Sequence, residues 1–513
     1  MAGLAVRTRT AGGPDNHDRA VIRPWSRGRR STPARVATGV VAAAVLTGCL
    51  ATVVAVCAGQ LAGDVQSIGQ QQAPRVDAAT GLYFSLNDMD AQVANVLLIG
   101  ADKALAAGRV QDLALYASDR SAADQDLQQA TVSEAGNPAA LSALRTVLDR
   151  LGQFQGLAAD ALLADEQEGG GAGADRRPAT AAVSYFQQAT DLMSSEILPS
   201  VNSITTVSAN ELEASYHAGD DTAATGTLAV AGTGALLVSA LVALQVFLAV
   251  RYRRVVNPAL AAATVAAVAF TSLAVARLDS ASGQLTVAKR DAFDSILALT
   301  QARAVSYAAN ADESRYLVDP GRAAQYQLAF LTKSQELAEV GPVAISGYDA
   351  ALGADITAYQ RDNSDVRFGG YLGAEFRNIT FPGERAAAVA ALLAYQRYER
   401  DDRTLRALAA TSWPAAVSYD TGTAPSQSDG AFNSYDAALS AVTAVNQRAF
   451  AAALGSGSAA VSGWNAGWPA GAAVVVLGLA LAGVRPRLAE YRQASAAGLR
   501  PRGPAAARSR RRG

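Results

Sequence analysis

The run VATGVVAAAVLTGCLATVVAVCA, residues 36–58, contains no charged side chain. About 20 residues of this kind form a helix that crosses the hydrocarbon core of a bilayer and satisfies its own backbone hydrogen bonds there. Three more uncharged runs follow, at residues 226–250, 259–276 and 468–484. The last two are short, and they are flanked by residues typical of membrane interfaces, namely Trp464, Trp468, Arg277 and Arg485. The sequence therefore predicts four transmembrane helices.

Arginines near these spans predict their orientation, because cytoplasmic flanks of membrane helices retain positive charge. The arginines form three clusters: Arg23, Arg27, Arg29, Arg30 and Arg35 before the first span, Arg251, Arg253 and Arg254 between the second and third, and Arg485, Arg487 and Arg492 after the fourth. All three clusters fall on one side. We therefore expect a multi-pass protein of the cell membrane, with cytoplasmic Arg-rich tails (1–35, 485–513), a short cytoplasmic loop (251–258) and two extracytoplasmic segments (59–225, 277–467).

One motif in the first span allows a different interpretation. Leu46-Thr47-Gly48-Cys49 resembles a bacterial lipobox, and a basic region and a short apolar region precede it. After cleavage, Cys49 would become a lipid anchor. Residues 50–58 stay fully apolar, however, whereas lipoprotein linkers turn polar soon after the cysteine. We therefore favour an uncut transmembrane helix.

The composition argues against most enzyme classes. Half of the residues are apolar, 17% are charged and the formal net charge is −1, so bulk charge does not suggest a nucleic-acid partner. The two histidines, His17 and His217, and the two cysteines, Cys49 and Cys57, leave little material for a metal cluster, a histidine relay or a disulfide framework. Carboxylate chemistry remains, and its best candidate is Glu313. We expect no catalytic site, no metal site, no cofactor and no enzymatic activity.

The first outer segment has the pattern of an all-α bundle, because apolar residues recur at spacings of three and four. Its first helix carries one apolar stripe, formed by Ala79, Leu82, Leu86, Met89, Val93 and Val96. A second helix begins near Val110 and ends at Gly136-Asn137-Pro138, a third covers 141–163, a flexible linker spans 169–178, and a fourth helix, 179–217, leads into the second span. This order predicts an up-down four-helix bundle.

The second outer segment repeats this plan. Its first helix carries Phe293, Ile296, Val305 and Leu317 and breaks at Asp319-Pro320-Gly321, and later helices end near Gly341-Pro342 or cover 385–410 and 432–454. An irregular Gly- and aromatic-rich stretch at 368–384 interrupts the pattern. The predicted fold is therefore an all-α membrane protein with four transmembrane helices and two extracytoplasmic helical bundles, arranged as an internal duplication.

Two polar stretches are candidates for function. The first, SYAANADESRY at 306–316, places Asp312, Glu313, Arg315 and Tyr316 on consecutive helix positions. No histidine or second carboxylate is placed near Glu313 by the sequence, so an exposed helical face with local arginine pairing is favoured over catalysis. We keep these four residues as candidates for partner binding.

The second stretch, GAEFRNITFPGE at 373–384, is too irregular for a simple bundle helix. It combines Glu375, Arg377, Asn378, Phe381 and Glu384 with a Pro-Gly turn. Polar groups and an aromatic side chain on a shaped loop suit recognition of a partner. A structural cap over the bundle explains the same residues equally well, and both interpretations stay open.

Two sequence segments within these stretches are ANADESRYL at 309–317 and EFRNITFPGE at 375–384. They resemble the corresponding segments of a family of actinobacterial four-span membrane proteins, which are encoded beside a glutamine-binding lipoprotein and the soluble serine/threonine protein kinase G. The likeness covers the whole architecture, although Phe376 stands where an aliphatic residue is expected. The resemblance implies that an extracellular solute-binding lipoprotein senses amino acids such as glutamate or aspartate. The resemblance further implies that the four-span protein passes the signal to the cytoplasmic kinase.

The arrangement of the segments favours a non-enzymatic signal transducer. A helix that continues from an outer bundle into the bilayer transmits a shift or rotation of an ångström or two. Neither the loop at 251–258 nor the stretch after residue 484 encodes an output domain, so the output is expected from another polypeptide. A direct small-molecule receptor of the four-helix-bundle type and a structural cell-envelope protein remain alternatives.

Overall fold

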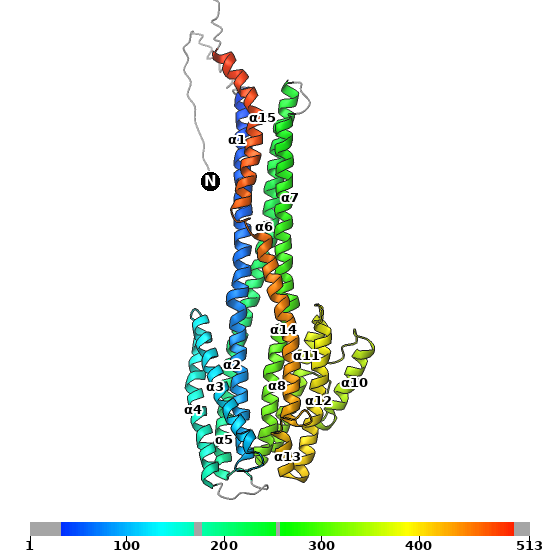
Figure 1. Ribbon diagram of the computed structural model, residues 1–513. Helices are drawn as coiled ribbons and strands as arrows, with labels where there is room; N and C mark the ends of the chain where they lie inside the picture. Colours follow the sequence, from blue (N-terminus) through cyan, green and yellow to red (C-terminus); the bar gives the residue numbers. More distant parts are fainter. Residues whose placement is uncertain (1–31, 169–176, 253–256, 497–513) are drawn as a thin grey trace, which may run out of the picture. The chain divides into compact units, whose positions relative to one another are not determined.

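The computed structural model describes residues 32–168, 177–252 and 257–496, and these ranges contain helices and loops but no strand (Figure 1). The predicted all-α class is confirmed. The first half holds α1 (Thr32–Ser67), η1 (Ile68–Gln72), α2 (Ala73–Ile99), α3 (Ala106–Ser133), α4 (Pro138–Glu168), α5 (Thr180–Leu192), η2 (Met193–Ile197) and α6 (Leu198–Tyr252). The second half holds α7 (Pro258–Thr286), η3 (Val287–Phe293), α8 (Asp294–Val318), η4 (Pro320–Arg322), α9 (Ala323–Leu337), α10 (Ile345–Arg361), α11 (Gly370–Asn378), α12 (Glu384–Thr411), α13 (Trp413–Asp420), α14 (Ser428–Val461) and α15 (Gly467–Ala496).

Within the described residues, four helical stretches are long and apolar enough to cross a membrane, and each contains one predicted span. They are Ala34–Ile99, Thr180–Val250, Pro258–Val318 and Gly467–Pro486. Length and composition thus indicate a membrane protein. The orientation stays a prediction, because many of the arginines that predict it lie outside the described residues. These are Arg23, Arg27, Arg29, Arg30, Arg253 and Arg254, together with the side chains of Arg251, Arg487 and Arg492. Most of the predicted linker at 169–178 lies outside them as well. Helix α1 runs without a break through the lipobox-like motif.

The described chain divides into two compact units. The first draws on Met1–Gly48, Leu236–Ala267 and Val474–Gly513. Within it, a Cβ at Gly39 would come 3.0 Å from Leu244 Cδ1, so this glycine lets α1 approach α6 closely. Asn257 Nδ2 donates a 2.7 Å hydrogen bond to the Gly483 carbonyl and thereby ties the start of α7 to α15. Small residues and a backbone contact therefore define the packing of this unit.

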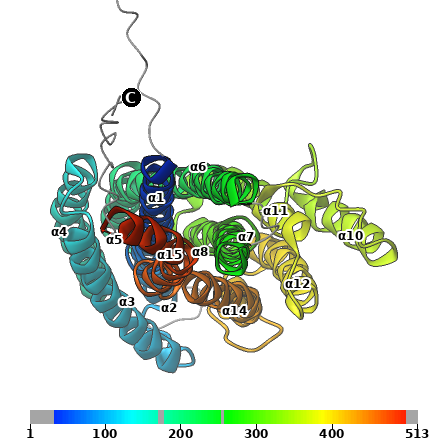
Figure 2. The same ribbon diagram turned by 90° about the horizontal axis from the view of Figure 1, so that it is seen from above.

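The second unit comprises Cys49–Ala235 and Val268–Ala473, and α8 is its central helix. Helices α2, α9, α11, α13 and α14 all pack against α8. Figure 2 shows α8 in the interior of the helix assembly, with α4 and α10 at opposite edges. A helix that is surrounded on all sides must bury every face, including any charged residues it carries.

Both predicted outer segments belong to this second unit and share one core. Leu82, Leu86 and Met89 of α2 lie in the same buried cluster as Leu317 of α8 and Leu405 of α12. The predicted stripe on α2 is fully buried, and every residue from Met89 to Ile99 is buried as well. Helix α2 therefore packs against its own segment with one face and against α8 with another, and the two segments form one body within this unit.

The helix boundaries differ from the expected ones in the second segment. Helices α10 and α13 were not anticipated, and α11 occupies Gly370–Asn378 inside the stretch expected to be irregular. Residues 368–369 and 379–383 of that stretch lie outside a helix. In both halves, a π-helical turn separates the span-containing helix from the first bundle helix, η1 before α2 and η3 before α8. The internal duplication itself stays a prediction.

Labelling of introduced cysteines tests the predicted topology, after replacement of Cys49 and Cys57 by alanine. Thr332→Cys and Ser121→Cys place thiols at exposed positions of the two outer segments, and both are expected to react with a membrane-impermeant maleimide in intact cells. Pro258→Cys, at the exposed start of α7, is expected to react only after permeabilisation. If Pro258→Cys alone reacted in intact cells, the predicted orientation would be wrong and the chain would be inserted the opposite way.

Candidate functional site

A buried ion-pair network joins α2 to α8. The Arg315 side chain of α8 is 4% exposed, and its Nε donates a 2.8 Å hydrogen bond to Oδ2 of Asp90 on α2, which is fully buried. Its Nη1 lies 2.7 Å from Oδ1 of Asp312, one turn earlier on α8. Lys333 of α9 pairs with the other oxygen of Asp312, and Thr190 of α5 donates a 3.0 Å hydrogen bond to Asp90. We call these five residues the Arg315 network.

The charges within the Arg315 network balance, with two carboxylates against a guanidinium and an ammonium. Removing one member of a buried ion pair leaves an uncompensated charge, which costs about 3–5 kcal/mol. The carboxylates of Asp90 and Asp312 outweigh burial and hold the pKa of Arg315 above its ordinary value, although burial alone would lower it. The network therefore fixes the relative position of four helices, α2, α5, α8 and α9.

Further polar contacts extend this interface along α8. Ser314 Oγ lies 2.8 Å from Asn95 Oδ1 of α2. Beyond the end of α8, Gln187 Nε2 of α5 donates a 2.8 Å hydrogen bond to Asp319. Arg322 makes a more exposed ion pair with Asp191, at 2.7 Å. The first segment of the chain thus contacts the second through polar groups over the C-terminal half of α8.

The other side of α8 faces a group of carboxyl groups with little compensating positive charge. This acidic cluster comprises Asp88 of α2, Asp112 and Asp119 of α3, Glu313 of α8, Asp402 of α12 and Asp420 of α13. Arg406 pairs with Asp402 at 2.7 Å, and Ser428 donates a 3.0 Å hydrogen bond to Glu313. Glu313 therefore has neighbouring carboxylates after all, and they come from other helices.

The pKa values in the acidic cluster are shifted upward. Burial, with a contribution from Asp88, raises the pKa of Asp112 to about 7 and that of Asp119 to about 8. Burial also raises the pKa of Asp420 to about 7, although its contact with Ser314 acts in the opposite direction. The pKa of Glu313 is raised by burial and by Asp402 and Asp420. Several of these groups therefore take up protons near neutral pH.

Stability is expected to depend on pH through these groups. Because their folded pKa values lie above those of the unfolded chain, the folded state binds more protons between about pH 4 and 8, and the free energy of unfolding rises as the pH is lowered through 8 and 7. We expect the thermal midpoint of the purified protein to rise by a few degrees between pH 8 and 6. Asp112→Asn with Asp420→Asn mimics the protonated state, so it should raise the midpoint at pH 8 and flatten this dependence. A midpoint that falls on acidification would contradict the assignment.

The expectation of an exposed face at 306–316 is wrong. Asp312 is 1% exposed, Glu313 is fully buried and Tyr316 is half-buried, because α8 is surrounded by other helices. Local arginine pairing is confirmed for Arg315 with Asp312. The main partner, Asp90, is distant in the sequence and was missed. The buried positions of Asp312, Glu313 and Arg315 also correct the idea that they lie at a docking surface in this conformation.

The stretch at 375–384 is held mainly by contacts within the chain. Glu384 accepts hydrogen bonds from the backbone N–H groups of Thr380 (2.7 Å) and Phe381 (2.8 Å), and Asn378 Nδ2 donates to the Arg290 carbonyl at 2.9 Å. These contacts tie the turn to η3, as a structural cap would be tied.

The carboxylates of this stretch are not presented to a partner. Glu375 and Glu384 are buried, and burial raises the pKa of Glu375 to about 7. This corrects their assignment to a docking surface. Arg377 is exposed, although its guanidinium donates to the Phe368 carbonyl at 2.9 Å, and Asn378 and Phe381 are half-buried. Partner binding by Arg377, Asn378 and Phe381 stays a prediction.

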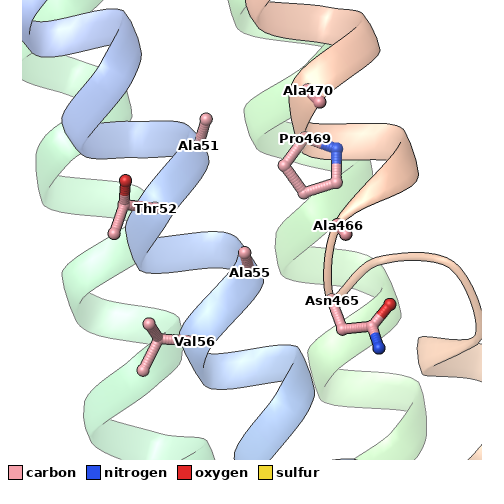
Figure 3. Close-up of a pocket in the computed structure, with 8 residues that line it drawn as sticks. All are labelled: Ala51, Thr52, Ala55, Val56, Asn465, Ala466, Pro469 and Ala470. Atoms are coloured by element: carbon pink, nitrogen blue, oxygen red, sulfur yellow. The ribbon is translucent and has the colours of Figure 1, made fainter.

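An apolar cavity of about 350 Å³ lies between α1 and the turn that leads into α15. Figure 3 shows Ala51, Thr52, Ala55 and Val56 of α1 opposite Asn465, Ala466, Pro469 and Ala470. None of these eight residues is ionisable. A zwitterionic amino acid needs polar partners, so this cavity does not suit such a ligand.

With this geometry in place, comparison with known proteins adds one finding. Residues 64–217 match the family model of the actinobacterial sensor domain. The matched range contains Asp90 and Thr190 of the Arg315 network. Searches of curated proteins and of solved structures gave no match. A sensor domain connected to helices of membrane-spanning length and composition supports an actinobacterial sensor protein with a role in sensing or signalling.

The residues that sequence reasoning missed share one signal. Asp88 and Asp90 flank Met89 of the apolar stripe of α2, in a helix whose residues from Met89 to Ile99 are all buried. A charged residue in such a helix requires a buried partner, because an unpaired buried charge is unstable. That signal predicts a partner for Asp90 but does not identify Arg315, which lies 225 residues away.

Loss of the central guanidinium is expected to destabilise the protein strongly. Arg315→Ala leaves Asp90 and Asp312 buried without their shared partner, so we expect a loss of about 3–5 kcal/mol in the free energy of unfolding, measured as a lower thermal midpoint. The matched control is Arg150→Ala, which removes an ion pair to Glu196 whose two side chains are both partly exposed, and it should cost about 0–1 kcal/mol. Equal losses in the two variants would refute a special role for Arg315.

Proposed function

We propose that this chain is a non-enzymatic transmembrane signal transducer. In this proposal, an extracellular solute-binding lipoprotein senses an amino acid and docks on the outer segments, and the chain relays the signal across the bilayer to a cytoplasmic partner such as a serine/threonine kinase. The match to a sensor domain and the four apolar helices support a sensory membrane protein. The likeness of residues 309–317 and 375–384 to the four-span family supports the choice of partners.

The Arg315 network is the observation that carries the relay. Its two principal helices each continue a candidate membrane span: Ala34–Ile99 is helical over 66 residues and ends in α2, and Pro258–Val318 is helical over 61 residues and ends in α8. A contact that links α2 to α8 therefore links two helical paths toward the membrane. Displacements of about 1–2 Å between packed helices are of the size used in known signalling transitions.

The chemistry of the site supports a relay more than catalysis. The carboxyl groups of Glu313, Asp402 and Asp420 are buried beneath neighbouring helices. A general acid or base has to reach a substrate proton within hydrogen-bond distance, directly or through one water. In the proposed function these groups serve the packing and protonation of the interface, and the output is supplied by the cytoplasmic partner.

The relay can be tested by reconstituting the response. The measurement is kinase-dependent phosphorylation in cells after addition of glutamate, aspartate or glutamine, with wild-type chain or with Asp90→Asn or Arg315→Met. We expect both variants to reach the membrane and to lose or shift the response, because each unbalances the α2–α8 contact. The matched control Arg150→Met, at the partly exposed pair with Glu196, should respond as the wild type does.

Two results would overturn the relay. A response that survives deletion of the whole chain would leave it a structural protein of the cell envelope. Tight binding of an amino acid by the purified chain alone, with no added effect of the lipoprotein, would make it a direct receptor. Calorimetric titration with glutamate, aspartate and glutamine, with and without the lipoprotein, distinguishes the two modes of sensing.

A further inference from the structure

A second cavity, of about 720 Å³, opens to solvent beside α9. Leu328 and Leu331 of α9 and Pro342 and Val343 of the following turn form its apolar walls, and Glu336 and Glu339 add two carboxylates. This volume lies within the range of about 300–1,000 Å³ that small-molecule sites occupy. Its lining combines apolar surface with a few charged groups, as such sites do.

The wall of this cavity is held in a defined shape by backbone contacts. Gly370 has φ +67°, and a Cβ at this position would come 2.5 Å from the Glu336 carbonyl oxygen, so only glycine fits there. The Gly369 N–H donates a 2.8 Å hydrogen bond to the Glu339 carbonyl. Gln335 bridges the turn, because its amide donates to the Gly341 carbonyl at 2.8 Å and accepts from the Val340 N–H at 3.0 Å. A preformed wall lowers the ordering cost of binding a ligand.

The two carboxylates of the cavity lack a cationic partner. Glu336 and Glu339 are exposed, and neither forms an ion pair with any residue in the described parts of the chain. The nearest lysine on the same helix, Lys333, is already paired with Asp312. An anionic ligand would be repelled here, whereas a cation would gain charge-assisted hydrogen bonds and could place an apolar body against Leu331 and Val343.

We propose that this cavity binds a small organic cation, an amine carried on an apolar body. The site stands without the relay, and only its effect on signalling rests on the proposed function. Glu336 lies one turn from Lys333 on α9, and Lys333 contacts Asp312 of the Arg315 network. Occupancy of the cavity therefore acts on the helix that supplies one of the two cations of that network.

Calorimetric titration of the full chain in nanodiscs of zwitterionic lipid tests the site. The probe is phenethylammonium, and 2-phenylethanol and 3-phenylpropanoate are its neutral and anionic counterparts. We expect saturable binding of the cation alone. E336Q combined with E339Q should weaken it about tenfold or more, as loss of charge-assisted contacts predicts. The control pair D149N with D160N removes the same charge from exposed positions of α4 and should leave affinity unchanged.

A second variant tests the apolar part of the site without altering its charge. Leu328 is 66% exposed, so L328W can project into the cavity without disturbing the core, and it should weaken binding of phenethylammonium. Equal binding of the three probes, unchanged affinity in the double glutamine variant, or binding of a basic protein but of no small cation would overturn the proposal. Binding of the cation without any change in the kinase response would support the site and refute its coupling to the relay. Absence of binding, with a kinase response that the Arg315 variants still abolish, would refute the site and leave the relay intact.

Discussion

The buried guanidinium of Arg315 is the constraint on which the packing of the second unit depends. A guanidinium excluded from water is stable only where carboxylates surround it, and Asp90 and Asp312 meet this need at 2.8 and 2.7 Å. Asp312 in turn requires Lys333, and Asp90 takes a hydrogen bond from Thr190. Placing one arginine in the last turn of α8 therefore determines where α2, α5 and α9 must lie. Apolar packing alone would tolerate several registers of these helices, whereas this set of charges tolerates one.

The two sides of α8 differ in how their charges are compensated. On the side of Arg315, positive and negative groups balance. On the side of Glu313, carboxyl groups from several helices share the nearby cation Arg406, which does not compensate them all. Burial and mutual repulsion therefore raise the pKa values of Asp112 and Asp420 to about 7. Near neutral pH this second side is expected to gain protons, so we expect the interior of the unit to be more stable in weakly acidic solution than in alkaline solution.

The sequence predicts the local elements well and the long-range contacts poorly. Uncharged runs locate the four candidate spans, and the stripe from Ala79 to Val96 correctly identifies the buried face of α2. The polar run on α8 was misread, because a dense set of charges usually marks a solvent-facing surface. Its partners, Asp90 on α2 and Asp402 on α12, lie in other parts of the chain and follow from no local spacing. The turn before α12 is a similar case, since Asn378 binds the backbone of η3, some 88 positions earlier.

An ionic contact between α2 and α8 suits a relay better than an apolar seam does. Apolar side chains slide past one another through many positions of similar energy, so a small displacement at one end dissipates. Sliding α8 by one turn, about 5.4 Å, would separate Arg315 from Asp90 and leave buried charges unpaired, at a cost of about 3–5 kcal/mol. Shifts of an ångström or two keep the ion pair and must be carried along both helices together. Because α2 and α8 each continue a candidate span through a π-helical turn, the proposed relay assigns two roles to this one contact: it holds the unit in register, and it passes a movement from either half to the other.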